Sequence, residues 1–138
     1  MPGASPELLD SVPLFAGLPA RERQEIASWM TERLLDSGDS IVVEGREGVG
    51  FFVIEAGTAR VSVAGEDVRR LGPGDFFGEI ALISGSPRSA TVTAETPLRC
   101  WGLTSWDFRP LVQKDATVAW ILLETLAKML AEGRAPEM

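Results

Sequence analysis

Apolar residues at helical spacing mark the first part of the chain. Residues 20–34 follow Pro19, and this segment predicts an amphipathic helix that begins after the proline. Its apolar positions lie three to four residues apart, at Ile26, Ala27, Met30 and Leu34. The apolar residues before it predict a short helical turn with an apolar anchor, formed by Leu8, Leu9, Val12, Leu14 and Phe15.

In the middle of the chain the pattern changes to short apolar runs separated by glycine. The runs predict strands because they are rich in β-branched and aromatic residues, and they cover residues 41–43, 51–54, 59–63, 68–71, 91–93 and 98–103. The glycines between them, such as Gly57, Gly65 and Gly74, are typical of tight turns. Many short strands at this spacing predict a small barrel or a jelly roll.

The last part of the chain is again helical, over residues 117–132. Its apolar residues form more than one stripe, and they are Val118, Trp120, Ile121, Leu122, Leu123, Leu126, Met129 and Leu130. Such a helix is expected to cover two surfaces, the roll and either a second subunit or the mouth of a pocket. Periodicity alone is equally consistent with all of these residues being ordinary core.

Length and composition narrow the classes of protein. On folding, a chain of 138 residues buries roughly two-thirds of the surface that it exposes when unfolded. Such a core needs no disulfide or bound metal to be stable. We expect one domain with an N-terminal helical segment at 1–36, a β roll at about 37–104 and C-terminal helices at about 105–132. The start of the chain has no signal-peptide pattern, and its longest apolar run, 118–123, is too short to span a bilayer. A cytoplasmic location without membrane contact is therefore expected.

Charge and residue types disfavour several functions. Lys and Arg number 13 against 20 Asp and Glu, so we expect no direct binding to nucleic acid. Histidine is absent and Cys100 is the only cysteine, which argues against a zinc site and excludes an internal disulfide. The flanks of Cys100 predict a buried strand in which the thiol packs as a small apolar group, and a single unpaired cysteine indicates a reducing compartment. Because no catalytic motif is present either, we expect a protein that is not an enzyme and holds no cofactor or metal.

One segment, residues 72–92, combines an acid and a base in a short apolar turn. Residues 78–82 predict one turn of helix whose first backbone N–H groups are free to bind an anion. Arg88 and Ser89 return after a short loop and add charge-assisted and hydroxyl contacts, while Glu79 is suited to accept from a ligand hydroxyl. Together they describe a site for a sugar phosphate. The alternative for Glu79 and Arg88 is an ordinary surface salt bridge, or an arginine whose aliphatic stem covers apolar surface.

The order of these residues resembles the phosphate-binding cassette of the cyclic nucleotide-binding domain family. The cassette pattern covers residues 77–82 and 87–92, and further similarity covers 13–15, Leu18, 38–41, 43–45 and 52–57. The resemblance implies an eight-stranded β jelly roll with N-terminal helices and a C-terminal helix that acts as a lid or in dimerisation. A jelly roll of the metal-binding cupin type is disfavoured because the chain has no histidine.

The resemblance also implies roles for individual residues. Glu79 would bind the ribose 2′-hydroxyl, Arg88 the cyclic phosphate, and Ser89 the phosphate or the base. The remaining ligand-binding candidates are the residues that supply backbone amides or shape the cassette, namely Gly78, Ile80, Ala81 and Ala90. Candidates for the pocket wall are Val61, Phe76 and Leu82, and candidates for the lid over the base are Trp120, Thr125 and Met129.

The chain departs from the family pattern in three places. Many relatives carry an aspartate in the turn that reads Arg-Glu-Gly-Val-Gly at 46–50, a difference that we interpret as structural. Counting from Arg88 places the family's base-contacting residue at Gly133, outside the predicted helix, so base recognition stays unassigned. Only six residues follow Glu132, so we expect no helix-turn-helix or channel segment here.

The leading hypothesis is a regulatory domain that binds a cyclic nucleotide, cAMP in preference to cGMP. Ligand binding would move the C-terminal helix and change its contact with a partner domain or a second subunit. The first alternative is a scaffold of the same fold that dimerises or docks without ligand. The second is the regulatory piece of a larger enzyme such as an acyltransferase.

Overall fold

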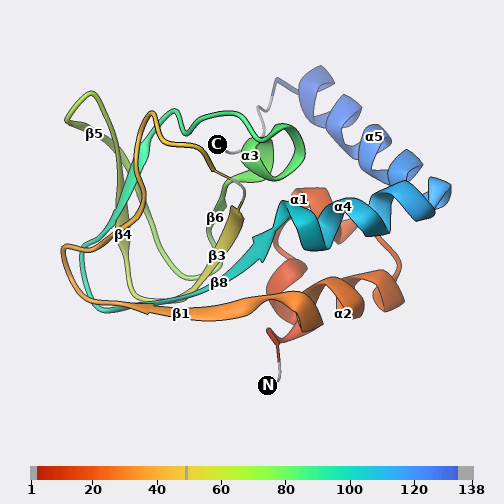
Figure 1. The fold of residues 1–138 in the computed structure, drawn as a ribbon, viewed down its shortest axis with the longest axis horizontal. Coiled ribbons are helices and arrows are strands. Elements are labelled where there is room, and N and C mark those ends of the chain that lie inside the picture. The colour runs from red at the N-terminus through yellow and green to blue at the C-terminus, as the bar shows by residue number, and fades with distance from the viewer. Residues whose placement is uncertain (1–2, 49, 134–138) are drawn as a thin grey trace.

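The computed structural model describes residues 3–48 and 50–133, and it places strands and helices on opposite sides of the molecule (Figure 1). The helices are η1 (Pro6–Leu9), α1 (Pro13–Ala16), α2 (Ala20–Trp29), α3 (Glu79–Ser84), α4 (Ser105–Lys114) and α5 (Ala116–Ala131). The strands are β1 (Thr31–Leu35), β2 (Ser40–Val42), β3 (Gly50–Ala56), β4 (Ala59–Val63), β5 (Glu66–Leu71), β6 (Phe76–Phe77), β7 (Thr91–Ala94) and β8 (Leu98–Thr104).

The strands form two antiparallel sheets, with the orders β1-β8-β3-β6 and β2-β7-β4-β5. This arrangement confirms the predicted mainly β fold with flanking helices. α3 lies at the boundary between the roll and the helical side, so the segment that carries the acid and the base joins the two (Figure 1). The short helix predicted at 78–82 and the long one predicted at 117–132 are both present as α3 and α5.

β3 separates two apolar cores because its side chains alternate between its faces. Phe51 and Val53 belong to the helical core, where the Phe51 ring meets Phe15 edge-on at 5.3 Å between centroids. Phe52 and Ile54 belong to the core inside the roll. Cys100 on β8 lies in that second core, and burial raises the pKa of its thiol to about 11, as expected for a packed apolar cysteine.

The helix predicted over residues 20–34 is wrong in its last third, residues 30–34. α2 ends at Trp29, and the next residues turn into β1, which pairs with β8 from Thr31 opposite Gly102 to Leu35 opposite Leu98. Leu34, predicted on the buried stripe, is 68% exposed. The β roll therefore starts at Thr31 instead of residue 37, because pairing with a distant strand overrides the local preference of this segment for helix.

α5 resolves the alternatives left open by its pattern. Val118 and Leu122 pack in the helical core. Trp120, Leu123 and Leu130 are 63%, 57% and 69% exposed, so not all of the apolar surface is ordinary core. Asp115 caps the helix start by accepting from the backbone N–H groups of Thr117 and Val118 at 3.1 and 3.2 Å.

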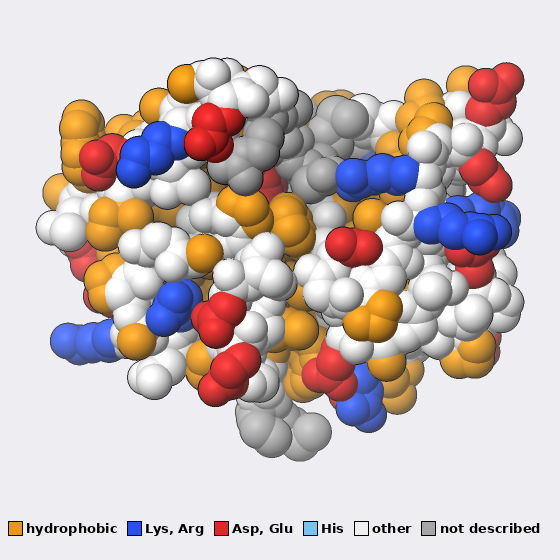
Figure 2. Space-filling model, turned by 180° about the vertical axis from the view of Figure 1, so that it is seen from behind, with side chains coloured by type: hydrophobic (Ala, Val, Ile, Leu, Met, Phe, Trp, Pro, Cys, Tyr) orange, Lys and Arg blue, Asp and Glu red, His pale blue; other side chains and the backbone are white. Residues whose placement is uncertain are grey.

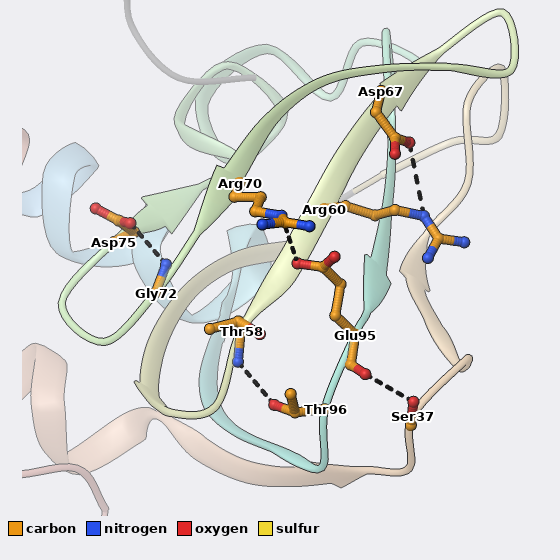
Figure 3. Close-up of polar contacts among 9 residues, drawn as sticks. All are labelled: Ser37, Thr58, Arg60, Asp67, Arg70, Gly72, Asp75, Glu95 and Thr96. Carbon is orange, nitrogen blue, oxygen red and sulfur yellow. Dashed lines mark hydrogen bonds and ion pairs between the residues drawn. The ribbon is translucent and has the colours of Figure 1, made fainter.

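The outer surface of the roll carries exposed polar contacts. On the second sheet, Arg70 meets Glu95 at 3.2 Å and Arg60 meets Asp67 at 3.6 Å (Figure 3). On the face opposite to that of Figure 1, acidic and basic side chains are interspersed (Figure 2). No helix in the described part of the chain is long and apolar enough to cross a membrane.

Candidate functional site

The site begins at Gly78, where the chain leaves β6 and enters α3. Gly78 has a φ of +100°, a backbone conformation that favours glycine. A Cβ at this position would also lie 2.5 Å from the carbonyl oxygen of Gly50. Glycine is therefore required twice, for its conformation and for the close approach of β3. Glu79 is the first residue of α3, so the turn fixes where its side chain starts.

The loop after α3 returns the chain to the residues that precede β3. The Arg88 backbone N–H donates to Arg46 O at 2.8 Å, and the Gly45 N–H donates to Arg88 O at 2.8 Å. A further bridge pairs Glu47 with Pro87. β7 starts three residues later, at Thr91. The backbone at Arg88 is therefore fixed on one side by its bonds to residues 45 and 46 and on the other by the start of a strand.

The Arg88 side chain is buried, with 6% of the residue exposed. Its Nη2 donates to the carbonyl oxygen of Gly50 at 2.6 Å. Within the described residues, its Nη1 has no hydrogen-bond partner. Burial lowers the pKa of this guanidinium, but arginine is so basic that it stays charged at neutral pH.

Glu79 is fully buried, with 0% of the residue exposed. Burying a carboxylate is costly unless other groups compensate its charge or hydrogen bonds. The alternative of a surface salt bridge does not apply to this pair, because neither Glu79 nor Arg88 is at the surface. Two buried charged groups in one cassette are more typical of a binding site than of surface electrostatics.

A cavity of about 170 Å³ opens beside Arg88. It is lined by Ile80, Ala81, Ser86, Pro87, Arg88 and Ser89. One water occupies roughly 30 Å³ in the liquid, so the cavity has room for a group of phosphate size. Four of the predicted ligand-binding residues thus line one cavity. Ser86 and Pro87 were missed, because their loop lacked any signal beyond turn-forming residues.

The other predicted residues lie elsewhere. Val61 is in the core of the roll and Ala90 packs against that core, whereas Phe76 and Leu82 contact the helical core. Among the lid candidates, Trp120 is mostly exposed and Met129 is buried. Thr125 donates from Oγ1 to Ile121 O at 2.9 Å. The structure places none of these side chains on the wall of the cavity beside Arg88.

A second, apolar cavity of about 330 Å³ lies between α3, α4 and α5. Leu82 and Ile83 of α3 line it together with Phe108 of α4 and with Leu122 and Leu126 of α5. The sequence pattern allowed α5 to cover the mouth of a pocket but could not place this cavity, because it forms only where three separate helices meet. Among the described residues there is no cluster of side chains that could hold a metal ion.

Comparisons with known proteins agree on one family. The family model described as cyclic nucleotide-binding domain matches residues 32–115. A cAMP-dependent protein kinase regulatory subunit of Yarrowia lipolytica is 38% identical over 106 residues, 75% of this chain and 28% of the relative. A cyclic nucleotide-gated potassium channel of Mesorhizobium japonicum is 40% identical over 119 residues, 86% of this chain and 33% of the relative. The chain thus spans about a third or less of these relatives.

Solved structures show the same fold. The N-terminal domain of a transcriptional regulator from Streptomyces coelicolor A3(2) has a TM-score of 0.83 and 29% identity, covering 91% of this chain and 92% of that one. The regulatory domain of Toxoplasma gondii PKA with cAMP has a TM-score of 0.72 and 28% identity, covering 92% of this chain and 48% of that one.

Proposed function

The chain belongs to the cyclic nucleotide-binding domain family, and from this premise we propose that it is a non-catalytic regulatory module that binds cAMP at the cavity beside Arg88. The observation that carries the proposal is the state of Arg88. It is buried, borders a cavity of suitable size and keeps an Nη1 that has no hydrogen-bond partner among the described residues. Such a group is prepared to hold an anion.

The phosphate would lie against Arg88 and the start of α3. Nη1 of Arg88 is the donor available to a phosphate oxygen, and Ser89 adds a hydroxyl at the rim of the cavity. Ile80 and Ala81 of α3 complete the wall of the cavity. Because the site is largely shielded from water, charge-assisted bonds to the phosphate gain strength there.

Glu79 would hold the sugar. As an ionised carboxylate it only accepts hydrogen bonds, which suits the ribose 2′-hydroxyl and disfavours a second anion. The base preference is for cAMP ahead of cGMP, which is supported by the cAMP complex of the similar Toxoplasma gondii domain. Ser89 is compatible with both bases.

Ligand binding would be transmitted through α3 to the C-terminal helices. Leu82 and Ile83 of α3 share the apolar cavity with Phe108 and Leu122, so a shift of α3 changes the packing of α4 and α5. A lid formed by Trp120, Thr125 or Met129 would require α5 to move over the nucleotide. The ligand drives this change only if it binds the closed arrangement more tightly than the open one.

The exposed side of α5 is the proposed output. Trp120, Leu123 and Leu130 are spaced by three and seven residues and form one apolar stripe on a helix. A second copy of this chain or a partner domain would bind there. The same stripe favours the second candidate function, a scaffold that docks without ligand. A regulatory part of a larger enzyme is compatible with the fraction of its relatives that the chain spans.

The test is calorimetric titration of the protein with cAMP and with cGMP, using 5′-AMP as the control ligand and Arg88→Ala as the control variant. We expect saturable binding of cAMP, weaker binding of cGMP, and binding of both weakened by about 2–3 kcal/mol in Arg88→Ala. Absence of binding and of thermal stabilisation with both cyclic nucleotides would contradict the proposal and favour the scaffold.

A further inference from the structure

The described residues before β3 and the first residue of β3 contact Arg88 at several points. The backbone of Gly45 and Arg46 is bonded to that of Arg88. Gly50, the first residue of β3, accepts the hydrogen bond from Nη2. Gly48 lies between these anchors and is buried. The position of the guanidinium thus depends on a segment about forty residues earlier in the sequence.

Gly48 leaves the space that the Arg88 side chain fills. A Cβ built on Gly48 would lie 2.0 Å from Nε, 2.5 Å from Cζ and 2.8 Å from Cδ of Arg88. These separations are far below any van der Waals contact, so an alanine here and Arg88 in its present position exclude each other. At Gly50, by comparison, a Cβ would lie 3.8 Å from Nη2, an ordinary contact distance.

The need for glycine at position 48 is one of space and not of backbone conformation. The glycines with positive φ include Gly45 and Gly78, and Gly48 is not one of them. A left-handed backbone is therefore not what requires glycine at this position. All three atoms closest to its Cβ belong to the Arg88 side chain, which makes Arg88 the group that an alanine would displace.

We propose that Gly48 is a positioning residue for Arg88, the side chain proposed to bind the phosphate. By lacking a side chain it lets Arg88 lie with Nη2 on Gly50 O and with Nη1 beside Gly78 at the start of α3. This inference rests on the proposed function, since it takes Arg88 to be the group that binds the phosphate of the cyclic nucleotide. Gly48 itself does not contact the ligand in this scheme.

The test compares Gly48→Ala with Gly72→Ala. Gly72 is a matched control, because a Cβ there meets nothing within 4 Å and its φ is not positive. Titration with cAMP is expected to show binding weakened about tenfold or more in Gly48→Ala, the effect of misplacing a charge-assisted contact. Gly72→Ala is expected to stay within about twofold of the unmodified protein. Equal affinities of the two variants would overturn the inference.

A stability cycle decides whether the effect acts through Arg88. Thermal unfolding is measured for Gly48→Ala, Arg88→Ala and the double variant. Gly48→Ala should lower the unfolding temperature when Arg88 is present and lower it no more than Gly72→Ala does once Arg88→Ala has removed the clash. An equal loss in both backgrounds, or a double variant that fails to fold, would overturn the inference.

The two failures are distinguishable. If the unmodified protein binds no cyclic nucleotide, the proposed function fails. The stability cycle still shows whether the missing side chain at Gly48 makes room for the Arg88 side chain. If the unmodified protein binds cAMP and Gly48→Ala binds it equally well, the proposed function stands and the positioning role falls.

Discussion

Arg88 and Arg99 show two different uses of an arginine in one roll. Arg99, on β8, has a side chain that is 47% exposed, with Nε 3.1 Å from Glu32 and Nη1 3.1 Å from Glu55. The hydrogen bond to Glu55 and the charge of Glu32 raise its pKa. Arg88 is buried, its Nη2 donates to a backbone carbonyl, and its burial lowers its pKa.

The difference lies in where the partners of each charge are found. Arg99 bridges carboxylates of β1 and β3, so it ties neighbouring strands together and stays hydrated. Arg88 is removed from water while, within the described part of the chain, Nη1 lacks a hydrogen-bond partner. A buried donor without a partner is costly, and a bound anion would relieve that cost. Burial and a donor without a partner among the described residues therefore set Arg88, the proposed ligand-binding arginine, apart from Arg99, which joins neighbouring strands.

The largest expected effect separates the two arginines by ligand affinity. Arg88→Ala should weaken cyclic nucleotide binding by about 2–3 kcal/mol, because it removes a charge-assisted contact in a shielded site. Arg99→Ala should leave the affinity nearly unchanged, since Arg99 pairs with carboxylates on the outside of the sheet. Calorimetry on both variants measures this, with unfolding curves to establish that each is folded. A similar loss of affinity in both variants would contradict the different roles assigned to Arg88 and Arg99.

The next effect concerns the buried acid. Glu79→Gln keeps the shape of the side chain but removes its charge, and it should weaken cAMP binding by about 1–2 kcal/mol. Titration with 2′-deoxy-cAMP sharpens the test, because this ligand lacks the hydroxyl assigned to Glu79. The unmodified protein should prefer cAMP over the deoxy analogue, and Glu79→Gln should discriminate less. Glu32→Gln, on the outer face, is the control and should retain the preference.

A smaller effect is expected on the free energy of unfolding when the exposed ion pairs of Arg99 with Glu32 and Glu55 are removed. Arg99→Ala should lower the free energy of unfolding by no more than about 1 kcal/mol, since exposed ion pairs contribute little. Most of this contribution should disappear at high salt, which screens exposed charges. Urea unfolding at low and high ionic strength measures both quantities. A loss that is large and independent of salt would show that Arg99 has a packing role instead.

The smallest effect is the pH dependence of the stability that Glu55 contributes through its contact with Arg99. The hydrogen bond from Arg99, and then that from Trp101, lower the pKa of Glu55 below its ordinary value of 4.5. A lowered pKa in the folded state adds stability that is fully present above the unfolded pKa and is lost as the pH falls through the folded pKa. Unfolding between pH 7 and acid should therefore be slightly less pH-dependent in Glu55→Gln. Identical pH profiles of the unmodified protein and Glu55→Gln would indicate that solvent screening cancels the contribution of Glu55 and Arg99 to stability.

The sequence alone determined the elements with a strong local pattern. The apolar spacing of α5, the β-branched runs of β4 and β7 and the order of the cassette were sufficient to predict these elements and the family fold. Glu79 and Arg88 became candidate site residues because a short motif carries them, with glycines that mark its turns. These features depend on neighbours within a few residues, and such neighbours are visible in a linear sequence.

Tertiary structure alone decided the features that depend on distant partners. Residues 31–34 were predicted as helix because the apolar spacing of residues 20–34 continues through them, yet pairing with β8 makes residues 31–35 the strand β1. The space at Gly48 has meaning only beside Arg88, and the apolar cavity exists only where α3, α4 and α5 meet. Strand pairing and side-chain packing join segments far apart in the chain, so their energies outweigh local preference while leaving little trace in the local pattern.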